Sequence, residues 1–196
     1  LIQLRLENTP KDNKDLIFYI TAIPLLIEYK KFEFREGEPL IKPLCLLITK
    51  DHDITYRALS TLVSISTTYN TEFSDAFCKT LEQLVVEAEN SGDRDSLLQI
   101  LIILSTLYTT FATTCSFILL SEKFSKLIIA RVSKVDDEEF VITVLELLSI
   151  ACVDETVRVF ITENFLPLLE RSMSNEKFQL YSSLVLIKTW SFTKLK

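Results

Sequence analysis

A helical pattern that recurs about every 40 residues is the strongest constraint on how this chain folds. It is clearest from Asp137 to Met173, where three apolar stripes follow one another. The first stripe uses the three- and four-residue steps that share one helix face: Val141, Val144, Leu145, Leu148, Ala151 and Cys152. The two shorter stripes contain Val153, Val157, Phe160 and Ile161, and then Leu166, Leu169 and Met173. Stripes this wide must be covered, because each fully buried Leu, Val or Phe side chain contributes about 1.5–3 kcal/mol.

Polar residues mark the expected helix ends. Asp136 and Asp137 predict an N-cap for the first helix, and Asn164 predicts one for the third. Ser96 and Gln99 have capping-box spacing and predict another helix start. Gly92 predicts a helix end, since glycine adopts the left-handed cap conformation most readily.

Similar stripes run through the rest of the chain. We predict repeats over residues 15–50, 51–92, 93–134 and 135–174, with a truncated fifth repeat over residues 175–196. With 2 Gly and 5 Pro, the chain lacks the turn chemistry of β-rich folds. Three segments per repeat, the middle one short, favour armadillo repeats over the two-helix HEAT form. The predicted fold class is therefore all-α: an armadillo-like right-handed helical solenoid of four repeats plus the truncated fifth, forming a single domain over residues 1–196.

The ends of the chain give a further expectation. The sequence starts at Leu1 without an initiator methionine or a signal-peptide pattern, and it stops at Lys196 within an apolar pattern. We interpret it as a fragment excised from a longer protein.

Charge limits the partners that the chain can bind. A formal net charge of -6 argues against nucleic acid, which needs a basic surface, and there is no basic block for an anionic membrane. The stretch from Ser96 to Ser121 carries no charged residue and is longer than the about 20 residues that cross a bilayer. However, threonines between Thr109 and Thr114 interrupt it. We therefore predict a helix break there and no membrane span.

The cysteines occur once per predicted repeat and include no CxxC pair. This spacing argues against a zinc site and against a dense disulfide framework. We predict buried, reduced thiols in a cytosolic protein at Cys45, Cys78, Cys115 and Cys152.

The sequence contains few candidate catalytic residues. The single histidine, His52, lies between Asp51 and Asp53 at a repeat junction, and a dyad with Cys45 is formally conceivable. We interpret His52 instead as a solvated turn residue beside a helix cap. No nucleotide-binding, zinc-protease or nucleophile-elbow motif occurs. We predict that the chain is not an enzyme and binds no cofactor.

Two groups of carboxylates are candidate cation sites. They are Asp136 to Glu139, and Glu87 with Glu89. Neither has the alternating ligands and the glycine of a calcium loop, so we interpret them as a capped helix start and an exposed helix face, with no metal.

Aromatic residues near the end of the chain form a candidate surface. They are Phe178, Tyr181, Trp190 and Phe192. They could form a partner site, but we favour a packing face for a further repeat. A generic armadillo transport adaptor remains a remote alternative, because the Asn and Trp ladders of import receptors are absent from the aligned final helices.

Several strings between Ile150 and Leu195 resemble the central region of fungal UCS-domain myosin chaperones of the She type. They are ACVDET from Ala151, ITEN from Ile161, LLERS from Leu168 and LIKTWSFTKL from Leu186. The last string is the most specific, since no generic armadillo consensus requires it. The resemblance is close in the second half of the chain and rests only on repeat register in the first.

This resemblance implies a cytoplasmic, non-enzymatic co-chaperone that supports myosin motor folding and actin organisation. Its implied partners are myosin motor domains, bound through a C-terminal UCS domain mostly absent here, and the large ATP-dependent heat-shock chaperone, with self-association as a further option. The chain would then be the central scaffold of such a protein. The alternative is a direct binding module that contacts a myosin motor or the heat-shock chaperone through its own concave face.

Overall fold

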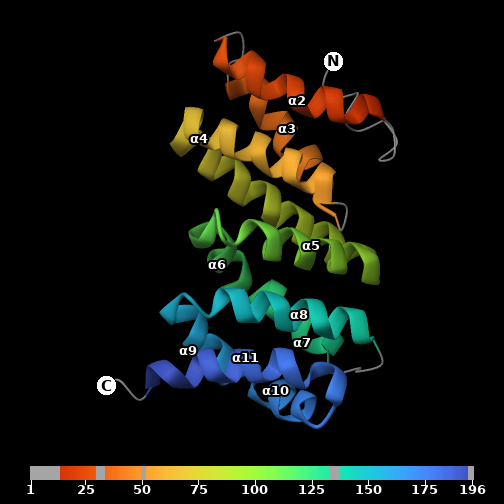
Figure 1. Ribbon diagram of the computed structural model, residues 1–196, viewed down its shortest axis with the longest axis vertical. Coiled ribbons are helices and arrows are strands. Elements are labelled where there is room, and N and C mark those ends of the chain that lie inside the picture. Colours follow the sequence, from red (N-terminus) through yellow and green to blue (C-terminus); the bar gives the residue numbers. More distant parts are fainter. Residues whose placement is uncertain (1–13, 30–33, 50–51, 133–136, 194–196) are drawn as a thin grey trace. The chain divides into compact units, whose positions relative to one another are not determined.

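The computed structural model describes residues 14–29, 34–49, 52–132 and 137–193, apart from the side chains of residues 14, 34–38, 52, 71 and 191–193. These described residues form helices and connecting turns, with no strand among them (Figure 1). The predicted all-helical class is confirmed. The chain divides into two compact units, Leu1–Glu87 and Ala88–Lys196, which are described separately. The single domain over residues 1–196 and the repeat boundaries stay predictions.

Unit 1 contains α2 (Lys14–Glu28), α3 (Phe34–Leu46) and most of α4 (His52–Ser91). The inward side of α2 is formed by Leu16, Ile20, Ile23 and Ile27, all at most 7% exposed. Helix α3 begins earlier than the apolar pattern alone suggests, because the Arg and Glu residues that precede the pattern are themselves good helix formers.

Pro24 lies inside α2 and has no N–H group to bond the carbonyl of Ile20. The hydroxyl of Thr61, in α4, donates to that carbonyl at 3.3 Å. Thr61 itself is 1% exposed, so the bond forms in the core of the unit. A neighbouring helix thus satisfies the acceptor that the proline leaves open.

Helix α4 departs from the expected three segments. It runs for 40 residues, with one non-helical position at Asn70 (φ 23°, ψ -88°). The side chains before and after this kink are buried as expected: Ala58, Leu62, Ile65, Phe73, Phe77, Leu81, Leu84 and Val85. The second repeat is therefore two helical arms joined at a kink, without a separate short helix.

The kink yields a first testable expectation. A positive φ costs an L-residue other than Gly about 1–2 kcal/mol, and Asn70 is exposed, so its side chain contributes little packing. Asn70→Gly should raise the melting temperature or leave it unchanged, whereas Asn70→Val should lower it. Thermal denaturation followed by circular dichroism checks this, and a lower melting temperature for Asn70→Gly than for Asn70→Val would contradict it.

Unit 2 repeats a long helix followed by two short helices. Its helices are α5 (Arg94–Leu107), α6 (Ala112–Leu120), α7 (Glu122–Val132), α8 (Glu138–Ala151), α9 (Glu155–Asn164), α10 (Leu166–Met173) and α11 (Glu176–Thr193). The long helices α5, α8 and α11 lie side by side in this order (Figure 1). Two successive sets thus show the three segments expected of each repeat.

The core of unit 2 is centred on α8. Its predicted stripe is confirmed, with Val141, Val144, Leu145, Leu148, Ala151 and Cys152 all at most 2% exposed. The second stripe is only partly right, because Val153 is 71% exposed while Val157 and Ile161 are buried. Val153 lies in the turn between α8 and α9, where the helical period is interrupted. Asp154 then caps α9 by accepting bonds from the N–H groups of Thr156 and Val157.

Two of the predicted helix ends are confirmed by the structure. Asp137 caps α8 by accepting the N–H of Phe140 at 3.2 Å, as expected, whereas Asp136 lies outside the described residues. Gly92 has φ 61° after α4, which confirms that helix end.

The predictions for two other caps, Ser96 and Asn164, were wrong. The N-cap of α5 is Asp93, whose carboxylate accepts both the N–H and the hydroxyl of Ser96, so Ser96 lies within the first turn. A carboxylate and a hydroxyl can both cap, and the chain uses the earlier one. Asn164 ends α9 instead of starting α10, because its amide donates back to the carbonyl of Phe160. Pro167 occupies the first turn of α10, where its missing N–H costs little.

The uncharged stretch from Ser96 to Ser121 is divided between two helices. α5 ends at Leu107 and α6 begins at Ala112, which confirms the predicted break. Among the helices described, none has both the length and the apolar character that crossing a bilayer requires.

Candidate interaction surfaces

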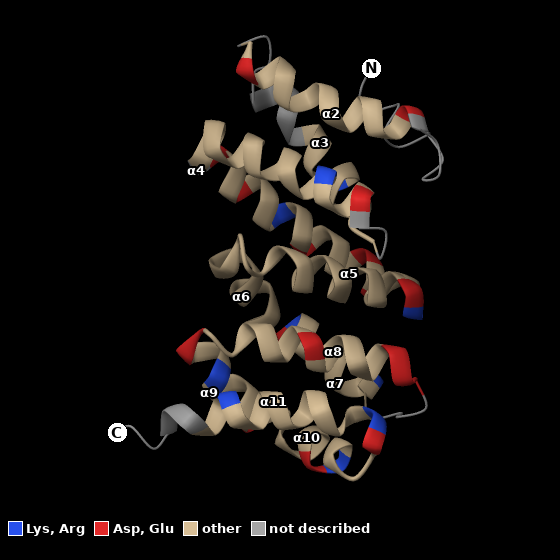
Figure 2. Ribbon diagram, in the orientation of Figure 1, with Lys and Arg blue, Asp and Glu red and all other residues tan. Residues whose placement is uncertain are grey.

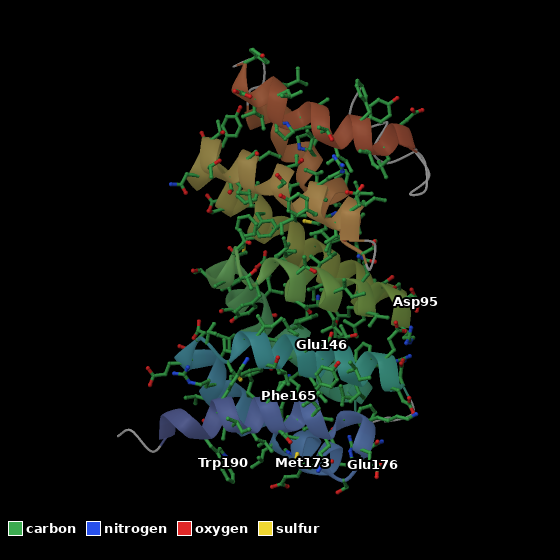
Figure 3. All side chains as sticks on the ribbon, in the orientation of Figure 1. Asp95, Glu146, Phe165, Met173, Glu176 and Trp190 are labelled. Carbon is green, nitrogen blue, oxygen red and sulfur yellow. The ribbon has the colours of Figure 1, made fainter. Side chains whose placement is uncertain are left out.

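The aromatic residues near the end of the chain do not form one cluster. Phe178 is 3% exposed and belongs to the core, and Tyr181 is half-buried. Trp190 is 64% exposed and lies on the side of α11 away from α8 (Figure 3). The side chain of Phe192 lies outside the described residues. Of the four, only Trp190 is shown on an outer surface.

An apolar stripe on α11 accompanies Trp190. Its members are Leu180, Leu184, Ile187 and Trp190, which are 65%, 40%, 63% and 64% exposed. Their spacing places them on one helix face. Val185, between Leu184 and Ile187, is fully buried and so lies on the opposite, inward face of α11. We refer to Leu180, Leu184, Ile187 and Trp190 as the α11 stripe.

Contacts between α8 and α11 show what the α11 stripe corresponds to. Lys177 Nζ binds Glu138, and Lys188 Nζ donates to the carbonyl of Ser149, and both contacts join positions 39 residues apart. The same offset aligns the α11 stripe with Val141, Leu145, Leu148 and Ala151 of α8, all at most 2% exposed.

The aligned residues of α8 are buried and those of the α11 stripe are exposed because the two helices have different neighbours. The helices that precede α8 have counterparts that precede α11, so the additional burial on α8 comes from the helices that follow it. The α11 stripe thus has the repeat position that is covered on α8 by the helices that follow it.

The predicted carboxylate clusters form ion pairs across the repeat spacing. Arg94 lies at the centre of one group, with Nη2 2.7 Å from Asp137 Oδ1 and 2.9 Å from Glu139 Oε2. Lys177 pairs with Glu138 at 2.6 Å. Elsewhere in the chain Lys123 pairs with Glu89, and within unit 1 Lys42 pairs with Glu87 at 2.7 Å.

These pairs explain the acidic residues without a metal ion. The hydrogen bond from Arg94 holds the pKa of Asp137 below its usual range, against a smaller opposing effect of burial. No group of metal-ligating side chains is found in the described part of the chain.

A buried hydrogen-bond chain links three helices of unit 2. The hydroxyl of Tyr108, at the end of α5, lies 2.6 Å from the hydroxyl of Ser116 in α6. Ser116 donates in turn to Asp154 Oδ2, the cap of α9, at 3.1 Å. Because Ser116 uses its proton on Asp154, Tyr108 is the donor of the first bond. Burial raises the pKa of Tyr108, which keeps the phenol protonated for this role.

The thiols are positioned as inert core groups. None of the four described cysteines forms a disulfide, and Cys45, Cys115 and Cys152 are buried, as predicted, while Cys78 is half-buried. Burial raises the pKa of Cys115 to about 12 and that of Cys152 to about 11. Such thiols stay protonated at neutral pH, and the thiolate is the form that attacks or binds metals. The conceivable partner of Cys45, His52, has its side chain outside the described residues.

A small pocket was not expected from the sequence. It has a volume of about 170 Å³ and lies between the end of α4, the start of α5 and α7. Its apolar wall comes from Ala88, Leu97, Leu127 and Ala130. Ligand pockets for drug-sized molecules measure about 300–1,000 Å³, so this one could hold only a side chain or a very small molecule.

A family described as "Myosin-binding striated muscle assembly central", named UNC45-central, matches residues 25–196. The chain belongs to the UNC45-central family. The predicted resemblance to the central region of She-type UCS proteins is thereby confirmed.

One curated sequence and one solved structure are similar to this UNC45-central chain. SWI5-dependent HO expression protein 4 of Saccharomyces cerevisiae is 40% identical over 184 residues, which cover 94% of this chain and 23% of that protein. The crystal structure of She4p matches with a TM-score of 0.88 and 38% identity, covering 100% of this chain and 26% of that one. This match confirms the armadillo-like helical class. The chain spans about a quarter of the length of the relatives it matches.

Proposed function

We propose that this chain is a non-enzymatic scaffold section of a myosin-directed co-chaperone. The observation that carries the proposal is the UNC45-central match over residues 25–196, in a family whose description names myosin binding and assembly. The repeated helices support it, because stacked repeats hold distant surfaces at fixed spacing without a catalytic site. The α11 stripe fits this role as a packing face for further repeats.

The finer parts of the proposal concern partners and place of action. The myosin motor domain would be bound mainly through a UCS domain that lies C-terminal to this section. The large ATP-dependent heat-shock chaperone would act with it in the cytoplasm, and actin organisation would depend on the myosin that it supports. Self-association of the co-chaperone is a further element of the proposal.

Removing two whole predicted repeats, residues 93–174, from the full-length protein tests the scaffold role. The shortened protein should still fold, because the remaining repeats keep the spacing of their neighbours. We expect it to support less folded myosin in cells, measured as soluble motor protein that binds actin. If the shortened protein folded normally and both the amount of folded myosin and the oligomeric state of the co-chaperone were unchanged, the scaffold proposal would be overturned.

A direct binding module is the second candidate. The observation that favours it is the set of exposed apolar side chains on α6, α9 and α11, including Phe117 at 56%, Val159 at 54% and Leu180 at 65%. A pull-down of the isolated chain with a purified myosin motor domain distinguishes the two candidates. Retention of the motor supports the module, and its clean absence removes this candidate while leaving the scaffold role intact.

A further inference from the structure

An arginine side chain joins the ends of two successive short helices in unit 2. Arg171 lies in the last turn of α10, and its Nη2 donates to the carbonyl oxygen of Val132, the last residue of α7, at 3.2 Å. The carbonyls of a last turn have no partner within their helix and form the negative end of the helix dipole. A guanidinium suits them, because it is charged and carries several N–H groups in one plane.

One repeat earlier, the corresponding positions hold no arginine. Buried side chains align α7 with α10 at an offset of 41 residues and α4 with α7 at an offset of 43, through the pairs Phe124–Phe165, Ile128–Leu169, Leu81–Phe124 and Val85–Ile128. With these offsets Arg171 corresponds to Ala130, and Val132 corresponds to Glu89. Both Ala130 and Glu89 line the small pocket of unit 2, which we call the α4–α7 pocket. The pocket therefore lies where the following repeat has an arginine side chain.

The α4–α7 pocket has the lining that the stem of a basic side chain requires. Its apolar wall comes from Ala88, Leu97, Leu127 and Ala130. Long basic side chains pack their methylene groups on apolar surface while the charged head stays at a polar edge. Glu89 and Asp93 provide such an edge, and the volume of about 170 Å³ suits one side chain.

The charges around the pocket favour a cation. The residues that line it, together with the ion-pair partners of these residues, comprise five carboxylates and three basic side chains: Glu89, Asp93, Asp95, Asp137 and Glu139 against Arg94, Lys123 and Arg131. Figure 2 shows acidic residues in the first turns of both α5 and α8. Hydrogen bonds from Ser96 lower the pKa of Asp93 most, and the charge of Arg131 lowers it further, so Asp93 stays ionised. The local excess of negative charge attracts a basic group.

A second copy of the chain offers no suitable arginine among its described side chains. Apart from Arg131, which lines the pocket itself, each described arginine side chain is already bonded: Arg57 to Asp53, Arg94 to Asp137, Arg158 to the carbonyl of Cys152 and Arg171 to that of Val132. The occupant is therefore expected from a different protein.

We propose that the α4–α7 pocket binds an arginine side chain presented by another protein. The stem of this arginine packs against the apolar wall, and its guanidinium donates to the carbonyl end of α4 and pairs with Asp93. Arg171 makes the equivalent contact with the end of α7. The inference goes beyond the scaffold role and does not rest on it, because it gives this section of the protein a partner contact of its own.

Titration followed by methyl NMR tests the proposal on the purified chain. The probe is N-acetyl-arginine methylamide, and the matched probe is its citrulline analogue, which has nearly the same shape but no charge. The arginine probe should give saturable shifts of the methyl signals of Leu97, Leu127 and Ala130, and its affinity should fall with added salt. The citrulline probe should bind about tenfold or more weakly, because it lacks the charge that strengthens these hydrogen bonds.

Variants of two pocket residues separate this site from the rest of the acidic surface. Ala130→Arg supplies the missing side chain from α7 itself and should abolish saturable binding. Its melting temperature should be unchanged or higher, because Ala130 is exposed and a basic residue is favourable in a last helical turn. Ala130→Ser is the matched control and should bind like the unaltered chain. Arg131→Ala should bind the arginine probe more tightly, because it removes a cation from the lining.

Several results would overturn the proposal. They are the absence of saturable shifts with the arginine probe, equal affinity for the citrulline probe, retained binding in Ala130→Arg, and loss of binding in Ala130→Ser. Weaker binding in Arg131→Ala would assign the pocket to an anion, and a dimer that Ala130→Arg abolishes would assign it to a second copy of the chain. Because no myosin is present, failure here leaves the test of the scaffold function separate.

Discussion

Leu148→Asp is expected to unfold unit 2. Leu148 is 0% exposed at the centre of the confirmed α8 stripe. Losing a buried leucine side chain costs about 2–5 kcal/mol, and burying an unpaired carboxylate adds a cost of several more. Domains are stable by only about 5–15 kcal/mol, so the two costs together are comparable to the whole stability. Circular dichroism should show loss of helical signal and of a cooperative melting transition.

The matched control is Ile187→Asp, at the position of α11 that the 39-residue offset aligns with Leu148. Ile187 is 63% exposed, and exposed substitutions usually change stability by less than about 0.5 kcal/mol. The melting temperature of this variant should stay close to that of the unaltered chain. An unchanged melting temperature for Leu148→Asp would show that the repeat register is wrong. Equal damage from both variants would show that the α11 stripe is not the outer counterpart of the α8 stripe.

The stripe of α8 could be predicted from sequence because helical period and apolar spacing are local properties. The exposure of Leu184 and Ile187 could not, because the same apolar pattern occurs whether or not a following helix covers it. The periodicity of the sequence indicates which face of a helix is apolar. Whether that face is buried or exposed to solvent depends on the neighbouring helices.

The helix ends show a similar limit. Asp93 and Ser96 are both good caps, and sequence alone does not decide between two competing side chains three residues apart. No glycine or proline in the sequence marks the kink at Asn70. Its only local signal is that asparagine tolerates positive φ better than most residues.

The candidate surfaces depended on contacts between residues far apart in the chain. The uncharged stretch was visible from sequence, but its contact with the cap of α9, through the bond between Ser116 and Asp154 38 residues apart, was not. Likewise, acidic residues before α8 were predicted as caps. Their pairing with Arg94, 43 residues before Asp137, has no sequence signal without a known repeat register.

Arg94→Ala should destabilise unit 2 by about 1–2 kcal/mol, because it removes charge-assisted hydrogen bonds that are partly shielded from solvent. Arg94 and Asp137 have side chains that are each 29% exposed, and Arg94 also pairs with Asp95 and Glu139. Its loss leaves the Asp137 carboxylate, which also caps α8, without its principal partner. Chemical denaturation of the chain at neutral pH measures the change.

The pH dependence of this effect tests its electrostatic origin. Hydrogen bonding to Arg94 lowers the folded pKa of Asp137, so the pair stabilises the folded state wherever the unfolded carboxylate is ionised, above its ordinary pKa of about 3.9. The stabilisation is lost as the pH falls through the lower, folded pKa. The difference in stability between the unaltered chain and Arg94→Ala should therefore be constant near neutral pH and shrink in acid.

Lys126→Ala is the control for an ordinary surface ion pair. Lys126 pairs with Glu122 one turn away in α7, and their side chains are 73% and 81% exposed. Its removal should change stability little at any pH, because solvent screens such a pair. If Arg94→Ala changed the stability at neutral pH as little as Lys126→Ala, the ion pairs between positions about one repeat apart would contribute no measurable stability. The apolar faces alone would then hold the helices together. A loss specific to Arg94 that fades in acid would instead show that ionic contacts help to fix each repeat of this scaffold against the next.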